Sequence, residues 1–136
     1  DNMRKYSQEN LQQLYGNLPE DLQKALFSQE NADNIQNACQ QAGIEEKASQ
    51  VSEQIGYVLL GIITPEEMEN NLVEELGLDK EKARNIRREI TKSVFSPIKK
   101  TLEDLLDTKI NVPKEIVKKE EKEEKEEEDK YREVIE

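Results

Sequence analysis

The sequence contains no histidine and no tryptophan, and it has a single cysteine, Cys39. Without an imidazole or a second thiol, the chain cannot supply Ser-His-Asp or Cys-His catalysis, a tetrahedral Cys/His zinc site or an internal disulfide. Its five glycines stand apart in the sequence, so they form no phosphate-binding loop. These absences predict a protein that is not an enzyme and that uses no metal or cofactor.

Long apolar runs are also missing. The longest, residues 58–63, is far below the roughly 20 residues that a membrane-spanning helix needs, and the N-terminal residues show no signal-peptide pattern. Cys39 stands near Ile35, Ala38 and Ala42, a setting that suits a buried thiol in a reducing compartment. We therefore expect a soluble, cytoplasmic protein without a membrane partner.

Charged residues are abundant, at 38% of the chain, and the net charge is −11. Leu, Ile, Val and Phe still make up 33 of the 136 residues, which lies above the roughly one-fifth below which charged chains tend to stay disordered. Almost all of them lie between Leu11 and Leu106, so the core is expected there. It should be aliphatic, with Phe27 and Phe95 adding bulk. Carboxylates are so plentiful that no pair of them marks an acid–base site.

One pattern occurs twice, with its glycines 34 residues apart. The two copies are Ala42-Gly43-Ile44-Glu45 and Leu76-Gly77-Leu78-Asp79. Each is followed by a lysine, an alanine and aliphatic residues at helical spacing, ending at Leu59 in the first copy and Val94 in the second. Both copies predict a helix, a glycine stop, an acidic cap and a second helix, which together indicate a duplicated helical hairpin.

Capping residues and apolar periodicity predict the individual helices. Ser28 is expected to cap one helix, Thr64 to open another with a capping box to Glu67, and Pro97 to break the last helix near Ser96. The predicted helices cover about residues 7–15, 19–26, 29–42, 45–62, 65–76 and 79–106. Gly56 and Gly61 fall inside the fourth of these, where they favour a close approach between helices; the alternative is a surface that another backbone or a ligand comes near.

These signals predict an all-α protein, a compact bundle of five to seven short helices built from a duplicated helical hairpin, with a charged C-terminal extension. We divide the chain into an N-terminal helix at 1–17, a helical bundle domain at 18–108 and a tail at 109–136. Residues 118–130 are only Lys, Glu and Asp, which favours disorder or a solvated single helix. The start of the tail is expected to dock as an extended strap through Ile110, Val112, Pro113, Ile116 and Val117.

The candidate partner-binding residues are Arg84, Arg87, Arg88 and Lys92. They lie in residues 79–100, which carry eight basic and three acidic residues, a net charge of +5, whereas residues 114–136 have a net charge of −4. The basic stretch can be a solvated helix face, a surface for a protein or for the acidic tail, or a contact for nucleic-acid phosphates. Interruption by acidic residues and a scarcity of aromatic residues disfavour nucleic acid.

Three segments, residues 18–28, 57–67 and 95–98, carry a further signal. In them the chain resembles a group of small, uncharacterised all-helical bacterial proteins, and the resemblance covers about residues 18–106. It implies that the bundle is a unit of its own with variable ends, and it implies no activity, cofactor or catalytic residue.

The favoured hypothesis for function is a non-enzymatic protein-protein interaction module. A first alternative is a nucleic-acid-binding module that uses the basic helix at 80–100 and has the acidic tail as a competitor. A second alternative is a homo-oligomeric structural subunit, because the core is thin and the apolar stripe from Ala83 to Leu106 is long.

Overall fold

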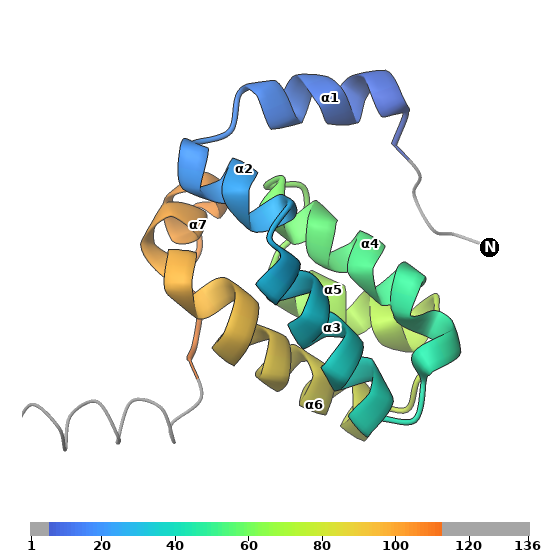
Figure 1. The fold of residues 1–136 in the computed structure, drawn as a ribbon. Coiled ribbons are helices and arrows are strands. Elements are labelled where there is room, and N and C mark those ends of the chain that lie inside the picture. The colour runs from blue at the N-terminus through green and yellow to red at the C-terminus, as the bar shows by residue number, and fades with distance from the viewer. Residues whose placement is uncertain (1–5, 113–136) are drawn as a thin grey trace, which may run out of the picture.

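The computed structural model describes residues 6–112, which form an all-helical fold, as predicted (Figure 1). The α-helices are α1 (Gln8–Gly16), α2 (Glu20–Leu26), α3 (Gln29–Gln41), α4 (Ala48–Leu59), α5 (Pro65–Glu74), α6 (Lys80–Ile90) and α7 (Lys99–Leu106). The 3₁₀ turns Glu45–Lys47 and Ser96–Ile98 and the π-helical turn Thr91–Phe95 complete the described part. The predictions for the charged segment beyond residue 112 lie outside the described residues.

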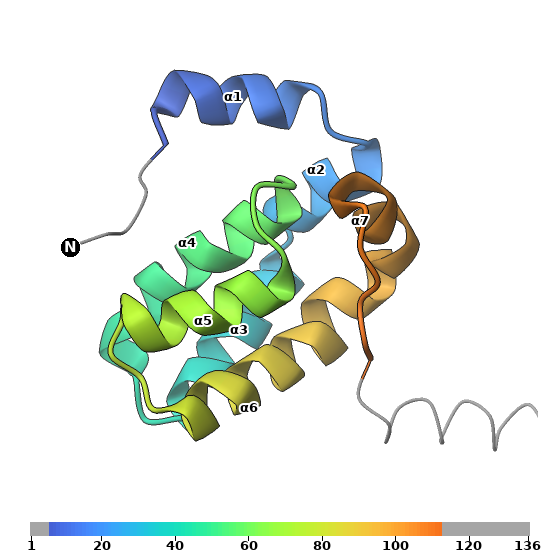
Figure 2. The same cartoon turned by 180° about the vertical axis from the view of Figure 1, so that it is seen from behind.

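Helices α3, α4, α5 and α6 pack together as the body of the molecule, and α2 and α7 lie at one end of it (Figure 1). The turns that join α3 to α4 and α5 to α6 both lie at the opposite end (Figure 1, Figure 2). Helix α1 runs beside the α2 end of the body and contributes no buried residue. The packed unit is therefore made by α2 to α7.

The helix starts follow the capping residues that the sequence predicts. The side-chain oxygens of Ser28 and Thr64 each accept a hydrogen bond from the amide three residues later, at 3.1 Å, and Asp79 Oδ1 accepts one from Lys82 N at 2.7 Å. Thr64 N also donates to Glu67 Oε1 at 2.9 Å, which closes the predicted capping box. Each cap satisfies an amide that the helix itself leaves without a partner.

The acidic cap predicted at Glu45 is wrong. Residues 45–47 form a 3₁₀ turn without a side-chain cap, and α4 begins only at Ala48. The glutamate side chain is one methylene longer than aspartate and is not among the side chains that favour the N-cap position. Lys47 instead reaches across to the second hairpin, where its Nζ donates to the carbonyl of Leu76 at 2.7 Å. This bond joins the two glycine turns.

The end of α4 also differs from the prediction. The helix stops at Leu59, and Gly61 comes after it with a φ of 80°, so this glycine is a helix stop and not a helix interior. A Cβ at Gly61 would lie 2.8 Å from Cγ of Leu105 on α7, which is the close approach expected there. Gly56 remains helical, and a Cβ there would meet only Leu26 Cδ2, at 4.0 Å.

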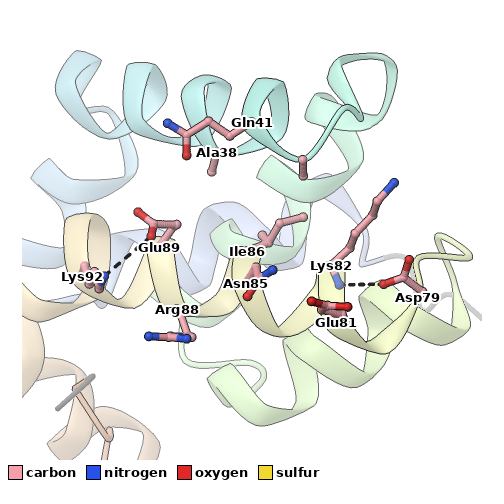
Figure 3. A pocket seen from close by; sticks show the side chains of 11 residues that line it. Ala38, Gln41, Asp79, Glu81, Lys82, Asn85, Ile86, Arg88, Glu89 and Lys92 are labelled. Atoms are coloured by element: carbon pink, nitrogen blue, oxygen red, sulfur yellow. Dashed lines mark hydrogen bonds and ion pairs between the residues drawn. The ribbon is translucent and has the colours of Figure 1, made fainter. Parts of the chain in front are cut away.

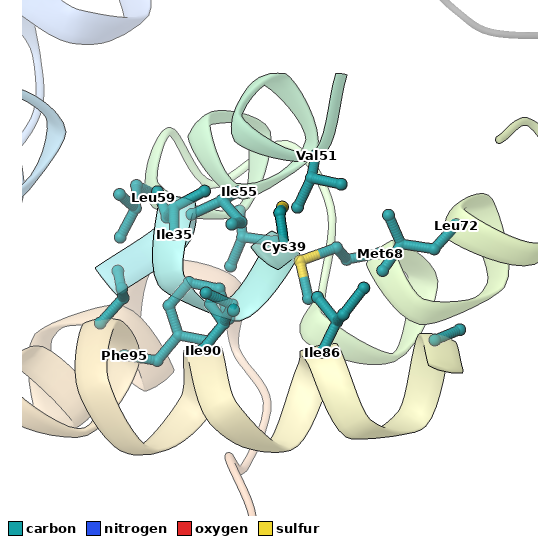
Figure 4. Close-up of a cluster of buried hydrophobic side chains, with 14 of the residues drawn as sticks. Ile35, Cys39, Val51, Ile55, Leu59, Met68, Leu72, Ile86, Ile90 and Phe95 are labelled. Atoms are coloured by element: carbon teal, nitrogen blue, oxygen red, sulfur yellow. The ribbon is translucent and has the colours of Figure 1, made fainter. Parts of the chain in front are cut away.

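The core lies between α3, α4, α5 and α6 (Figure 4). Its labelled members in that view are Ile35, Cys39, Val51, Ile55, Leu59, Met68, Leu72, Ile86, Ile90 and Phe95. Helix α4 supplies six buried residues, Val51, Gln54, Ile55, Tyr57, Val58 and Leu59. The prediction for Phe27 is wrong, since its side chain is 77% exposed. Phe27 is the C-cap of α2, where the chain turns toward α3 and the side chain leaves the inward face held by Leu22 and Ala25.

The predicted break near Ser96 is present but begins earlier. The chain leaves the α-helical pattern at Thr91, passes through the π turn and the 3₁₀ turn that contains Pro97, and resumes as α7. Pro97 has no amide proton to donate, which accounts for a departure from regular helix around it. Beyond α7, Ile110 docks as predicted, with 4% exposure and its amide donating to Glu103 Oε2 at 2.7 Å.

Candidate functional site

The four predicted partner-binding residues do not form one patch. Successive helical residues differ by about 100° around the axis, so Arg87 points away from Arg88, whereas Arg84 and Arg88 are four residues apart and lie on one face. Arg87 is half-buried and faces α5, where its Nη1 lies 3.3 Å from Glu69 Oε1. Arg84 is exposed. Of the four, Arg88 and Lys92 are the two that line a groove between α3 and α6 (Figure 3).

This α3–α6 groove has a volume of about 630 Å³. Its apolar lining comes from Ala38 and Ala42 on the α3 side and from Ile86 on α6. The two alanines are four residues apart and so lie on one face of α3. Their small side chains leave space for the groove beside that helix. Ile86 is 1% exposed and belongs to the core, so the floor of the groove is fixed by the packing of the body.

Charged side chains of both signs form the walls. Asp79 and Glu81 lie at the start of α6 together with one base, Lys82, whereas Arg88 and Lys92 lie at or beyond its last turn (Figure 3). Lys92 Nζ is 3.7 Å from Glu89 Oε1, so this end is not purely basic. Acids at the start and bases at the end are the order that the helix dipole favours. The groove therefore changes from predominantly acidic to predominantly basic along its length.

Besides the acidic residues, three polar lining residues were not among the four predicted ones: Gln41, Lys82 and Asn85. The predicted residues were chosen for positive charge along one segment, and that criterion favours no amide side chain. Gln41 lies on α3 and the other two on α6, so only the tertiary packing of two distant segments brings them together. No signal local to either segment could have found this juxtaposition.

Two groups outside the α3–α6 groove, the Cys39 thiol and the Tyr57 phenol, have raised pKa values. Burial raises the pKa of the Cys39 thiol, and the thiol lies in the core rather than in the groove. The pKa of Tyr57 is also raised, first by burial and then by the charge of Glu53 and its hydrogen bond to the phenol. A raised pKa keeps both groups protonated at neutral pH, whereas a reactive thiol needs a lowered one.

The described residues contain no group of three or more His, Cys, Asp or Glu side chains that could hold a metal ion. Within residues 6–112, no helix has both the length and the apolar character to cross a membrane. Comparison of the chain with protein-family models, curated proteins and solved structures found no match.

Proposed function

We propose that the protein is a non-enzymatic interaction module that binds a helix of a partner protein in the α3–α6 groove. The observation that carries the proposal is the combination of an apolar floor with walls whose charge changes sign along the groove. An amphipathic helix laid into a groove makes its contacts in this way, with apolar residues on the floor and charged residues at the rims. The volume of about 630 Å³ suits several side chains of such a helix.

The charge order also favours one orientation of the partner. Helices commonly carry acids in the first turn and bases in the last, as α6 itself does. A partner helix antiparallel to α6 would bring its acidic end to Arg88 and Lys92 and its basic end to Asp79 and Glu81. Such complementarity increases the association rate and selects against partners with the reversed charge order.

The test is a double charge reversal, Arg88→Glu with Lys92→Glu, compared with Lys100→Glu, an exposed residue outside the groove. The full chain is used to capture binding proteins, and each captured protein is then titrated against the variants. We expect the double variant to weaken binding about tenfold or more, because reversed charges face the partner's acids. Equal binding by both variants would refute the use of this groove.

A homo-oligomeric subunit is the second candidate, and one observation favours it. Phe27 is 77% exposed, and Leu14 and Leu105 are 37% and 39% exposed. Exposed aromatic residues of this kind are enriched at protein interfaces. Light scattering at increasing concentration tests this candidate, with Phe27→Asp expected to lower the mass of any oligomer. A monomeric mass at high concentration would remove the candidate.

Nucleic-acid binding is the less favoured alternative. Glu81 and Glu89 stand among the basic residues of α6, and Arg87 is paired with Glu69. A chain that ends after Val112 keeps the docked Ile110 and removes the acidic tail. If the tail is a competitor, this truncation should bind nucleic acid at low salt more tightly than the full chain, with affinity that falls as salt rises.

We also propose that the α3–α4 and α5–α6 hairpins are two copies of one unit. Equivalent positions after the two glycines support it, since Val51 and Ile86 are 0% and 1% exposed, and Ile55 and Ile90 are 1% and 0% exposed. A hairpin of this kind cannot bury its apolar face alone, which gives a physical reason for pairing two of them. Expression of residues 28–60 alone should then yield no cooperative unfolding transition.

A further inference from the structure

A second pocket lies between α4 and α5, on helices other than those that form the α3–α6 groove. It has a volume of about 440 Å³ and is closed on one side by Tyr6, whose ring meets that of Tyr57 edge-on at 5.2 Å. Its lining combines these aromatic rings with amide and carboxylate side chains, and no basic residue among residues 6–112 lines it. Its chemistry therefore differs from the mixed charges of the α3–α6 groove.

A buried amide pair lines this pocket. Gln54 of α4 is only 1% exposed, and its Oε1 accepts a hydrogen bond from Asn71 Nδ2 of α5 at 2.9 Å. This bond uses the acceptor of Gln54 and one donor of Asn71. Within residues 6–112, no hydrogen bond is made by Gln54 Nε2 or by Asn71 Oδ1. The pair thus keeps one donor group and one acceptor available.

The position of the free donor, Gln54 Nε2, follows from the burial of polar atoms in this structure. Every fully buried side-chain nitrogen and oxygen among the described residues has a hydrogen-bond partner. Because Gln54 Nε2 has none, it must reach open space, and the space that Gln54 lines is this pocket. Placing an amide in a helix face that otherwise packs into the core is costly unless its polar atoms are satisfied. A ligand amide would satisfy both remaining groups.

The carboxylates of the pocket indicate what accompanies that amide. Glu74 and Glu75 lie at the last turn of α5, beside Asn71 in the same lining. Acids at a helix C-terminus are unfavourable because they face the negative end of the helix dipole. A ligand with positive charge would offset that repulsion, and the faces of Tyr6 and Tyr57 also attract cations.

We propose that the α4–α5 pocket binds a basic peptide through an amide group. The ligand carbonyl accepts from Gln54 Nε2, the ligand N–H donates to Asn71 Oδ1, and an adjacent Lys or Arg side chain pairs with Glu74 or Glu75. The amide belongs either to an Asn or Gln side chain or to the peptide backbone, which present the same donor and acceptor. This site is independent of the α3–α6 groove, so either can fail without the other.

The probe is a library of random decapeptides displayed on phage and selected on the full chain. We expect enriched peptides to be rich in Lys and Arg, and a synthetic copy of the best one to bind at least tenfold more weakly to Gln54→Met. Gln41→Met, which changes an amide of the other groove, is the matched control and should bind like the unaltered chain. Nuclear magnetic resonance should show the Gln54 side-chain NH₂ signals shifting on binding.

Two further experiments complete the test. Replacing each Asn and Gln of the selected peptide by Ala abolishes binding if a side-chain amide is recognised and preserves it if the backbone is. If Gln54→Met fails to fold, Glu74→Lys with Glu75→Lys supplies the comparison, since bases suit the end of α5, and this variant should also lose at least tenfold in affinity. Absence of enriched peptides, enrichment without basic residues, or equal binding by folded Gln54→Met would each overturn the proposal.

Discussion

The two glycine turns at one end of the bundle share a conformation but lead into different helix starts. Gly43 and Gly77 both have a φ of 73°, and the residues after them, Ile44 and Leu78, are buried at 4% and 6% exposure. After the first, the chain makes a 3₁₀ turn before α4, whereas Asp79 caps α6 directly. The glycine thus determines the turn, and the side chain two residues later determines how the next helix begins.

The spacing after each glycine accounts for part of this difference. Lys47 comes four residues after Gly43, and Lys82 comes five residues after Gly77. The extra residue gives the second copy room for an extended N-cap, in which Asp79 has a ψ of 161°. In the first copy, Lys47 lies close enough to the turn of the second copy to bind Leu76 O. One residue of difference therefore separates a capped helix start from a contact between the turns.

The largest expected effect comes from a third glycine of the same conformation. Gly61→Ala combines the left-handed backbone with a Cβ 2.8 Å from Leu105, and we expect a loss of roughly 2–4 kcal/mol in the free energy of unfolding. Urea unfolding measures it. Adding Leu105→Ala should remove the steric part and leave only the backbone part. If the double variant is no less affected than the sum of the single ones, the clash is not the cause.

At the two turns themselves the cost should be smaller and equal. A Cβ at Gly43 or Gly77 meets no atom within 4 Å. Gly43→Ala and Gly77→Ala should therefore each lower the free energy of unfolding by about 1–2 kcal/mol, through the left-handed conformation alone. Thermal and urea unfolding of both variants checks this. A difference of more than about 1 kcal/mol would show that the shared φ does not describe two equivalent turns.

The helix starts should respond differently to the same change. Asp79→Ala removes the acceptor for Lys82 N and should cost about 1 kcal/mol. Glu45→Ala removes an exposed side chain that caps nothing, so its effect should stay within about 0.5 kcal/mol. The comparison is made by urea unfolding at one pH and salt concentration. Equal losses for the two variants would contradict the assignment of Asp79 as a cap.

The smallest effect at neutral pH concerns Cys39, which lies 34 residues before Val73, the same separation as that between Gly43 and Gly77. Cys39→Val should change stability by under about 1 kcal/mol at pH 7, since a buried thiol acts as a small hydrophobe. At alkaline pH the two proteins should diverge. The unfolded thiol loses its proton above about pH 8.5, while burial raises the pKa of the folded one.

The unaltered chain should be the one that loses more stability at alkaline pH. There the unfolded state has lost a proton that the folded state still holds, so the stability of the unaltered chain falls as pH rises. The valine variant lacks this contribution and should lose less stability between pH 8 and pH 10, as unfolding curves across about that range would show. Tyr57 contributes a loss at higher pH in both proteins and cancels in the difference. Parallel curves would contradict the burial of the thiol.

The predictable parts of the fold are those that depend on interactions between residues close in sequence. Ser28, Thr64 and Asp79 act on amides three residues away, so a local pattern was sufficient to place them. The exposure of Phe27 and the end of α4 before Gly61 depend on how the helices pack against one another. The spacing of apolar residues along one segment does not specify that packing.

The candidate sites were less predictable for the same reason. Arg88 and Lys92 were selected by charge, but the groove that they line also needs α3, which is distant in sequence. Gln54 and Asn71 were missed because helix faces were assigned from their apolar residues, and a polar residue on the inward face does not contribute to that pattern. Their hydrogen bond makes sense only once α4 and α5 are side by side.

The π turn at Thr91–Phe95 marks a place where the length of this chain can change. A π turn closes its hydrogen bonds over five residues instead of four, so it accommodates one residue more than the α-helix around it. Deleting a residue there can leave a continuous α-helix, whereas deletion inside α6 would rotate Ile86 or Ile90 out of the core. A single-residue insertion or deletion is therefore best tolerated in this stretch. Such a change would alter the rotation of α7 relative to α6.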